Sequence, residues 1–210
     1  MLVHQRLCRR ERRAGKTHPR SLSYLLPKTF RPTMIQNREF LGAPVEIVTE
    51  RLCGVKPTMA DFPQFRTLDT SPSVQRFLFG RVCTVEESQE RLEKFIRHWD
   101  DHRFGEWVFR LRTGEFVGTC GLFYDLIDDA EVVALGYVLD EPYWGHGYAT
   151  EMARASMRVA FDDMEVAEVY GVIDPVNAPS RRVLEKNGFS FVKDFVYPVG
   201  WPSALFRATR

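Results

Sequence analysis

The order of the expected helices and strands predicts an α/β fold of mixed α+β type. Its central, mostly antiparallel sheet has six to seven strands, with helices on both faces. In the first half of the chain, strand-like runs follow one another across short turns, which is typical of an antiparallel meander. In the second half, strand-like and helix-like runs alternate, which is typical of a βαβα unit. Since 44% of the 210 residues are hydrophobic, the chain can bury the core of one globular domain.

The charge is distributed unevenly along the chain. Residues 1–33 hold nine Lys and Arg residues and a single acid, Glu11, so this segment carries +8 and the remainder carries −7. We expect 1–33 to be a basic, disordered tail and 34–210 to be the folded domain. Two other interpretations stay open for the tail: an Arg-rich organelle transit peptide, or an upstream extension in front of a translation start at Met34.

The composition also limits the kinds of partner that the protein can bind. A basic tail on an acidic domain does not favour a nucleic-acid-binding domain. No apolar stretch approaches the roughly 20 residues that span a bilayer, so we expect no membrane partner. The four cysteines are far apart and form no C-x-x-C pair, which disfavours a metal ribbon or a disulfide framework. We expect a cytoplasmic protein that is a monomer or a homodimer and binds no metal.

The first half of the domain begins with a strand over 45–52. Two helix starts follow, each with a capping residue and an acid three positions later: Thr58 with Asp61, and Thr84 with Glu87. The second of these helices continues as an amphipathic stripe as far as Trp99. The remaining elements are a hairpin of strands 106–112 and 115–124, an acidic loop over 125–129 and a strand over 131–139.

The second half begins with a helix over 149–161 and a strand over 166–173. A short helix over 179–186 then ends at Gly188, which stands where a left-handed residue is needed after a helix. Strands 189–192 and 204–208 complete the sheet.

The loop between strand 131–139 and the following helix carries the chemistry. Pro142 ends the strand, and Gly145 and Gly147 form a loop that runs directly into a helix. Glycines adopt backbone angles that other residues avoid, and a helix N-terminus offers free N–H groups and a positive dipole end. Together these features predict a pyrophosphate cradle. The spacing matches neither G-x-G-x-x-G nor the Gly-Lys-Ser/Thr of a P-loop.

The segment Trp144–Ala149 resembles the coenzyme A loop of GNAT acetyltransferases. Three further segments match in the expected order, and together the resemblance covers about residues 45–209. Asn177–Phe189 is similar to the second coenzyme A segment of the superfamily. Thr49–Leu52 and Thr58–Asp61 are similar to the first strand and first helix start of the branch that includes the ribosomal-protein N-terminal (Rim-type) acetyltransferases.

The resemblance implies a GNAT-like fold whose sheet is splayed near Leu139, and an acetyl-CoA-dependent N-acetyltransferase without a metal. It implies direct transfer of the acetyl group, in a ternary complex, to a primary amine of a protein N-terminus or a small molecule. The candidate acceptors are a protein N-terminus, a polyamine, an aminoglycoside and an amino-acid derivative. The residues expected to bind acetyl-CoA are Val138, Leu139, Asp140, Trp144, Gly145, His146, Gly147, Tyr148, Ala149, Thr150, Asn177 and Ser180.

The catalytic expectations rest on one departure from the superfamily pattern. Leu184 stands where many members carry a tyrosine that reprotonates the coenzyme A thiolate. Ser180 matches a serine near the thiol in the Rim-type branch, and we expect it to donate a hydrogen bond there; otherwise it is an ordinary helix-start serine. Asn177 either holds the coenzyme A arm or caps the same helix.

Glu131 is the expected general base, acting directly or through water. The alternative is a solvated acid at a strand end. The loop acids Asp125, Asp128 and Asp129 are other candidates, or they attract a cationic amine.

Three other functions stay open at this point. The first is a transferase that uses a different acyl-CoA, such as a succinyl transferase. The second is a non-catalytic acyl-CoA sensor, which the missing tyrosine favours. The third is an RNA-associated protein that uses the Arg-rich tail, although the acidic domain disfavours it.

Overall fold

The computed structural model describes residues 42–196 and 200–210, so the expected tail over 1–33 lies outside the described residues. The strands are β1 (Glu46–Val48), β2 (Leu52–Val55), β3 (Glu106–Leu111), β4 (Phe116–Ile127), β5 (Ala130–Leu139), β6 (Glu168–Ile173), β7 (Ser190–Val196) and β8 (Pro202–Thr209). The helices are α1 (Phe62–Thr70), α2 (Pro72–Gln75), α3 (Val85–His102), α4 (Tyr148–Arg158) and α5 (Ala178–Lys186). Short helical turns are η2 (Met59–Asp61), η3 (Glu141–Tyr143) and the π-helical η4 (Val159–Asp163).

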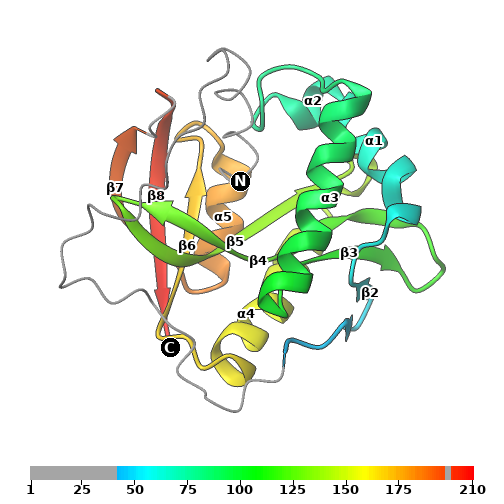
Figure 1. Cartoon of the computed structure of the whole chain (residues 1–210). Helices are drawn as coiled ribbons and strands as arrows, with labels where there is room; N and C mark the ends of the chain where they lie inside the picture. Colours follow the sequence, from blue (N-terminus) through cyan, green and yellow to red (C-terminus); the bar gives the residue numbers. More distant parts are fainter. Residues whose placement is uncertain (1–41, 197–199) are drawn as a thin grey trace, which may run out of the picture.

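The strands form a single sheet in the order β1-β2-β3-β4-β5-β6-β8-β7, and only β5 and β6 are parallel neighbours (Figure 1). The predicted fold class, a mixed and mostly antiparallel sheet with helices on both faces, is confirmed. The described sheet has eight strands because the segment predicted as one strand over 45–52 is two. Thr49 divides it, since its hydroxyl accepts a hydrogen bond from the Leu52 N–H (3.0 Å) and its own N–H donates to the Leu52 carbonyl (2.9 Å).

Local capping chemistry sets the helix starts as predicted. Thr84 and Glu87 form a reciprocal capping box at α3: the Thr84 N–H donates to the Glu87 carboxylate (2.9 Å), and the Glu87 N–H donates to the Thr84 hydroxyl (3.2 Å). The Thr58 N–H likewise donates to the Asp61 carboxylate (2.8 Å) at η2. These bonds satisfy backbone donors that a helix leaves unpaired at its first turn.

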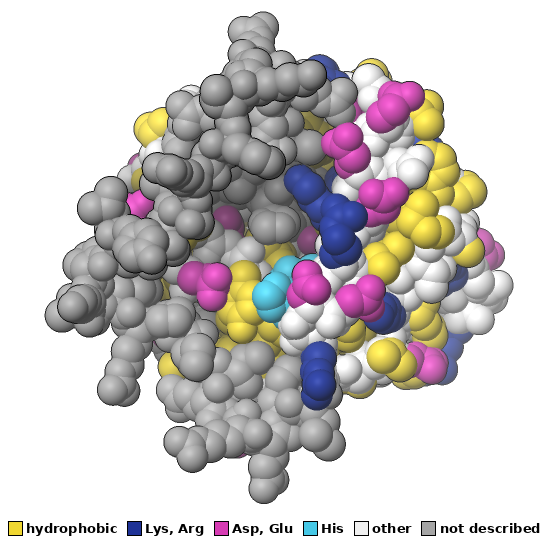
Figure 2. Space-filling model, viewed as in Figure 1, with side chains coloured by type: hydrophobic (Ala, Val, Ile, Leu, Met, Phe, Trp, Pro, Cys, Tyr) yellow, Lys and Arg dark blue, Asp and Glu magenta, His cyan; other side chains and the backbone are white. Residues whose placement is uncertain are grey.

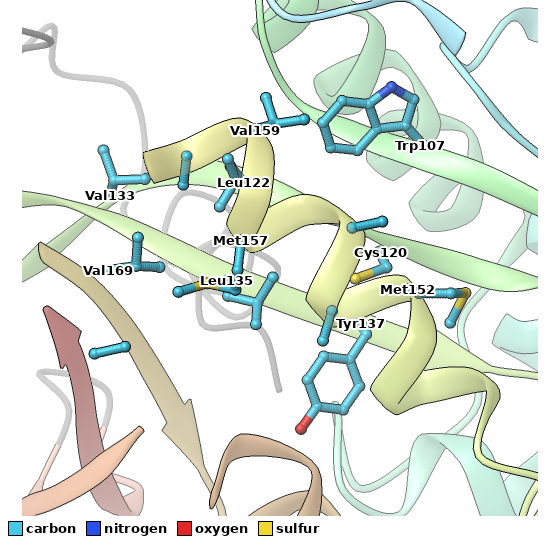
Figure 3. Close-up of a cluster of buried hydrophobic side chains, with 14 of the residues drawn as sticks. Trp107, Cys120, Leu122, Val133, Leu135, Tyr137, Met152, Met157, Val159 and Val169 are labelled. Carbon is cyan, nitrogen blue, oxygen red and sulfur yellow. The ribbon is translucent and has the colours of Figure 1, made fainter. Parts of the chain in front are cut away.

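The two faces of the sheet bury different helices. Val108 packs among side chains of α1 and α3, and Val138 packs among side chains that include Leu68 of α1. On the opposite face, Trp107 and Tyr137 lie in the cluster that contains α4 and α5 side chains. Figure 3 shows part of this cluster, with side chains of β4 and β5 against those of α4. The outer side of α3 is polar, and Figure 2 shows acidic and basic side chains interspersed on this face.

The acidic segment 125–129 differs from its prediction as a loop. Asp125 lies within β4 and is buried, and only Asp128 and Asp129 form the turn to β5, at φ angles of 51° and 62°. Two left-handed residues in a row are typical of tight hairpin turns, and Asp tolerates them better than most residues. The Asp128 carboxylate pairs with Lys193 of β7. Within the described ranges, no helix combines the length and the apolar character needed to cross a membrane.

The parallel strands β5 and β6 have the fewest paired residues of any neighbouring strands in the described sheet. Their ladder has a single registered pair, Ala134 with Tyr170, whereas β4 and β5 remain paired as far as Gly118 and Leu139. Strands β5 and β6 therefore separate beyond Ala134. This is the splay expected near Leu139.

A buried polar cluster lies between the sheet and α1 and α3. Arg91 and Asp69 form an ion pair (2.8 Å) with side chains that are 4% and 0% exposed. Glu106 on β3 is 4% exposed, and its Oε2 has no hydrogen-bond partner among the described residues. Burial raises the pKa of Glu106 to about 8, although the positive charge of Arg91 opposes this shift. Glu106 therefore favours its protonated form in the folded state.

Stability should consequently fall as the pH rises from about 4.5 to 8. In that window the folded protein retains a proton on Glu106 that the unfolded chain has released, so raising the pH favours unfolding by up to about 1.4 kcal/mol per pH unit. Replacing Glu106 by Gln should remove this dependence. The test is chemical denaturation at several pH values for wild type, Glu106→Gln and Glu50→Gln, the last being an exposed control. Parallel profiles for all three proteins would contradict the assignment.

Candidate functional site

A cavity of about 430 Å³ opens where β5 leaves β6. Its walls come from β5, from the loop and first turn of α4, from α5 and from the region of α2. Ten of the predicted acetyl-CoA residues line it: Val138, Leu139, Trp144, Gly145, Gly147, Tyr148, Ala149, Thr150, Asn177 and Ser180. The structure thus brings together two segments, the glycine loop and the start of α5, that are about thirty residues apart in the sequence.

The backbone of β5 offers hydrogen-bonding groups to this gap at alternate residues. The Asp140 N–H donates to the Val117 carbonyl (2.9 Å), so residues 140, 138 and 136 direct their backbone groups towards β4. By the same alternation, Tyr137 and Leu139 direct theirs towards the gap. Of the three backbone candidates, Leu139 therefore fits, whereas Val138 reaches the cavity through its side chain. Sequence reasoning missed Tyr137.

The loop before α4 has the geometry of an anion cradle. Gly145 and Gly147 have φ angles of 78° and 82°, and no protein atom lies within 3.4 Å of the place where a Cβ would stand at either residue. Gly147 is the N-cap of α4 and has no side chain to cap it. The N–H groups of Tyr148, Ala149 and Thr150 are therefore available at the positive end of the helix dipole. This arrangement fits a pyrophosphate.

Arg51, in the turn between β1 and β2, holds this loop from outside. Its guanidinium donates to the Glu151 carboxylate (2.7 Å) and to the His146 carbonyl (2.9 Å), and it lies 4.4 Å from the centre of the Tyr148 ring. The Thr49 hydroxyl also donates to Glu151 (2.6 Å). Partial burial alone would raise the pKa of Glu151, but the hydrogen bonds from Thr49 and Arg51 hold it below its usual value.

The start of α5 forms the opposite wall. The Asn177 side chain accepts a hydrogen bond from the Ser180 N–H (3.2 Å) and so caps the helix, although Asn177 also lines the cavity. The Ser180 hydroxyl lies 2.7 Å from the hydroxyl of Tyr137, which also donates to the Ser180 carbonyl (3.0 Å). Ser180 is 6% exposed and Tyr137 is 7% exposed. Burial raises the pKa of Tyr137 well above its usual value, against the effect of the bond to Ser180.

Two cationic residues of α5 were also missed. Arg182 and Lys186 line the cavity and are exposed, one helical turn apart. The available signal was their i, i+4 spacing on a helix already assigned to coenzyme A, because residues at that spacing share a helix face. Two such cations provide favourable electrostatics for a polyanion at the cavity mouth. The α2 region adds Ser73, Val74, Phe77 and Leu78 to the wall.

Three predicted site residues do not line the cavity. Asp140 caps η3, where its carboxylate accepts from the Glu141 N–H (2.9 Å). The His146 ring stacks beside Tyr148 outside the cavity, with 5.9 Å between the ring centres. Glu131 is exposed at the start of β5, six residues before Tyr137, which is about 20 Å at the rise of a strand. It is therefore too far from this cavity for direct contact with a group bound beside Tyr137.

Leu184, at the position of the usual tyrosine, does not point into the cavity either. It is 1% exposed and packs in the core beneath Gly171, where a Cβ on that glycine would lie 2.9 Å from the leucine side chain. His98 of α3 has a structural role. His98 contacts the Phe104 carbonyl (2.8 Å) and accepts from the Tyr124 N–H (3.2 Å).

Comparison with known proteins adds independent findings. The family model described as the acetyltransferase (GNAT) domain matches residues 51–190. The uncharacterized protein YkkB of Bacillus subtilis (strain 168) is 40% identical over 157 residues, covering 73% of this chain and 90% of its own. YjcK of the same organism, named as a probable N-acetyltransferase, is 29% identical over 160 residues, which cover 74% of this chain and 83% of YjcK. The structure of AAC(6')-Ib with ribostamycin and coenzyme A has a TM-score of 0.65 at 19% identity, covering 77% of this chain and 94% of that chain.

Replacing Gly147 by Val should weaken coenzyme A binding at least tenfold. A branched side chain there would meet the Arg51 guanidinium, whose Nη2 lies 3.5 Å from the Cβ position, and would strain a backbone held at φ 82°. Gly114→Val is the control for backbone strain, because Gly114 also has a positive φ (106°) but lies in the β3–β4 turn. Isothermal titration calorimetry on the two folded variants is the measurement. An unchanged dissociation constant for Gly147→Val would place the pyrophosphate elsewhere.

Proposed function

We propose that this chain, which belongs to the acetyltransferase (GNAT) family and is an N-acetyltransferase that uses acetyl-CoA, acetylates a primary amine. In the proposed reaction the amine attacks the thioester directly, within a ternary complex. The observation that supports this proposal is the cavity that joins the glycine loop, the gap beside β5 and the start of α5. Acetyl-CoA is a substrate here, not a resident group. We include in the proposal the branch of the ribosomal-protein N-terminal acetyltransferases, on the segments Thr49–Leu52 and Thr58–Asp61.

We propose that different residues of the cavity bind different parts of acetyl-CoA. The free N–H groups after Gly147 hold the pyrophosphate, and Arg182 and Lys186 supply positive charge for the phosphates. The backbone groups of Tyr137 and the N–H of Leu139 face the gap and bond the amides of the pantetheine arm, much as a neighbouring strand would. The Leu139 carbonyl accepts a hydrogen bond from the Trp144 indole N–H (2.9 Å). In this proposal the thioester lies beside Ser180, where β5 and α5 approach each other.

The chemistry makes three demands on the protein. The amine must attack as the free base, the tetrahedral oxyanion needs fixed donors, and the departing thiolate needs a hydrogen bond or a proton. We propose that a backbone N–H of β5 facing the gap binds the oxyanion. Ser180 donates a hydrogen bond to the sulfur from the opposite wall. A proton passes from the amine to solvent, because Glu131 lies too far away to accept it directly.

The reaction is tested by thiol release from acetyl-CoA against a panel of primary amines. The panel holds peptides with free N-termini, polyamines, aminoglycosides and amino-acid derivatives, with hydroxyl analogues of each as controls. We expect thiol release that matches N-acetylated product and intersecting double-reciprocal plots, as direct transfer requires. Parallel plots with a burst of thiol in the absence of amine would instead indicate an acyl-enzyme.

Replacing Ser180 by Ala should lower kcat about 10- to 1000-fold while leaving the affinity for acetyl-CoA nearly unchanged, by analogy with the loss of one oxyanion donor. Ser156→Ala is the matched control. Ser156 is a buried helical serine whose hydroxyl donates to the Met152 carbonyl (3.1 Å) and does not line the cavity. If Ser180→Ala turns over at the wild-type rate across pH 6 to 9, Ser180 has no role in catalysis and only forms part of the start of α5.

A further inference from the structure

The hydroxyl groups of Tyr137 and Ser180 meet across the two walls that bound the gap. Tyr137 comes from β5 and Ser180 comes from the first turn of α5, and their oxygens are 2.7 Å apart. Figure 3 shows the tyrosine ring beside α4, with its hydroxyl oxygen directed away from the labelled apolar side chains. The pair is buried, yet both residues line the cavity. A polar contact of this kind lies where the proposed function puts the thioester sulfur.

The proton count of the pair allows two arrangements. In the first, Tyr137 donates to the Ser180 carbonyl (3.0 Å) and the Ser180 hydroxyl donates back to Tyr137. The serine proton is then used inside the pair. In the second, the Tyr137 proton turns from the Ser180 carbonyl to the Ser180 hydroxyl oxygen, which leaves the serine proton free to point into the cavity. Because each hydroxyl has one proton and two acceptor positions, Ser180 can keep its hydrogen bond with Tyr137 and also donate to a bound group only in the second arrangement.

We propose that Tyr137 is a positioning residue that directs the Ser180 hydroxyl towards the sulfur of acetyl-CoA, and this inference rests on the proposed function. As the C–S bond breaks, its electron pair stays on sulfur, and negative charge develops there while the N–C bond forms. Ser180 then turns its proton to the sulfur, and Tyr137 supplies the hydrogen bond that the serine oxygen needs. The amine releases its proton to water, and water delivers a proton to the thiolate.

Tyr137 itself does not ionise in this scheme. Burial raises the pKa of its hydroxyl, so the phenol is a weaker acid here than in water. Its contribution is an oriented hydrogen bond within a low-dielectric wall, where such bonds are stronger than in water. In this scheme Ser180 of α5 and Tyr137 of β5 together take the role of the usual tyrosine on α5. The usual position of the phenol is occupied by Leu184, which is buried in the core.

A purely structural role for Tyr137 predicts a different set of results. In that case the hydroxyl only ties β5 to α5, and its removal would lower stability and the affinity for coenzyme A without a specific loss in kcat. The two roles are separated by Tyr137→Phe, which keeps the ring in its apolar cluster and removes one oxygen. Tyr170→Phe is the matched control, since the Tyr170 hydroxyl donates to Glu168 (2.6 Å) on β6, away from the cavity.

The experiment is a double-mutant cycle on Tyr137→Phe, Ser180→Ala and the double variant. It measures kcat, KM for acetyl-CoA, coenzyme A affinity and melting temperature. We expect Tyr137→Phe to lower kcat at least tenfold, with KM and affinity within twofold of wild type. In the Ser180→Ala background the same change should have less than a twofold effect, because Tyr137 acts through Ser180.

The outcomes distinguish this inference from the proposed function. Wild-type kcat in Tyr137→Phe, together with impaired Ser180→Ala, overturns the role of Tyr137 and leaves Ser180 in place. Independent effects of the two changes, or a loss confined to stability and coenzyme A affinity, also overturn it. Absence of amine acetylation by the wild-type protein would instead remove the proposed function itself.

Discussion

The separation of β5 from β6 is the constraint on which the site depends. Each strand is held by an antiparallel partner on its other edge: β5 pairs with β4 over ten registered residues, and β6 pairs with β8 over six. Because these ladders fix both strands, the gap between them cannot close by a small shift of either one. The backbone of β5 therefore directs groups of Tyr137 and Leu139 into the gap, where the Leu139 carbonyl accepts a hydrogen bond from the Trp144 indole N–H (2.9 Å). The cavity, the glycine loop and the start of α5 are all arranged around this opening.

The glycine loop depends in turn on the N-terminal hairpin. Glu151 stands in the first turn of α4, close to the place where phosphates are expected, and an unpaired carboxylate there would repel them. Arg51 neutralises it with an ion pair (2.6 Å) and also bonds the His146 carbonyl, so one side chain balances the charge and fixes the loop. These contacts give the segment Thr49–Leu52 a physical role beside the glycine loop.

Local chemistry explains which elements were predictable from the sequence. The capping boxes at Thr58 and Thr84, the turn at Gly188 and the run from strand through glycine loop to helix all depend on residues within a few positions of one another. The failures are also local in origin. The cluster of acids over 125–129 predicts a loop, but two aspartates at positive φ suffice for the turn, and Asp125 is buried in β4. The strand over 45–52 is broken by the Thr49 side chain, which competes with the sheet for backbone bonds.

The kind of domain, the glycine loop and most of the predicted residues that line the cavity could be read from the sequence, because loop and helix-start geometry follow from neighbouring residues. Which side chains face the same space depends on the tertiary structure. Tyr137 and Ser180 are 43 positions apart, and they meet because β5 and α5 form opposite walls of one gap. Leu184 lies on the core side of α5, and Glu131 lies at the far end of β5. Such placements depend on strand order and on the packing of helices against the sheet, which no local pattern in the chain encodes.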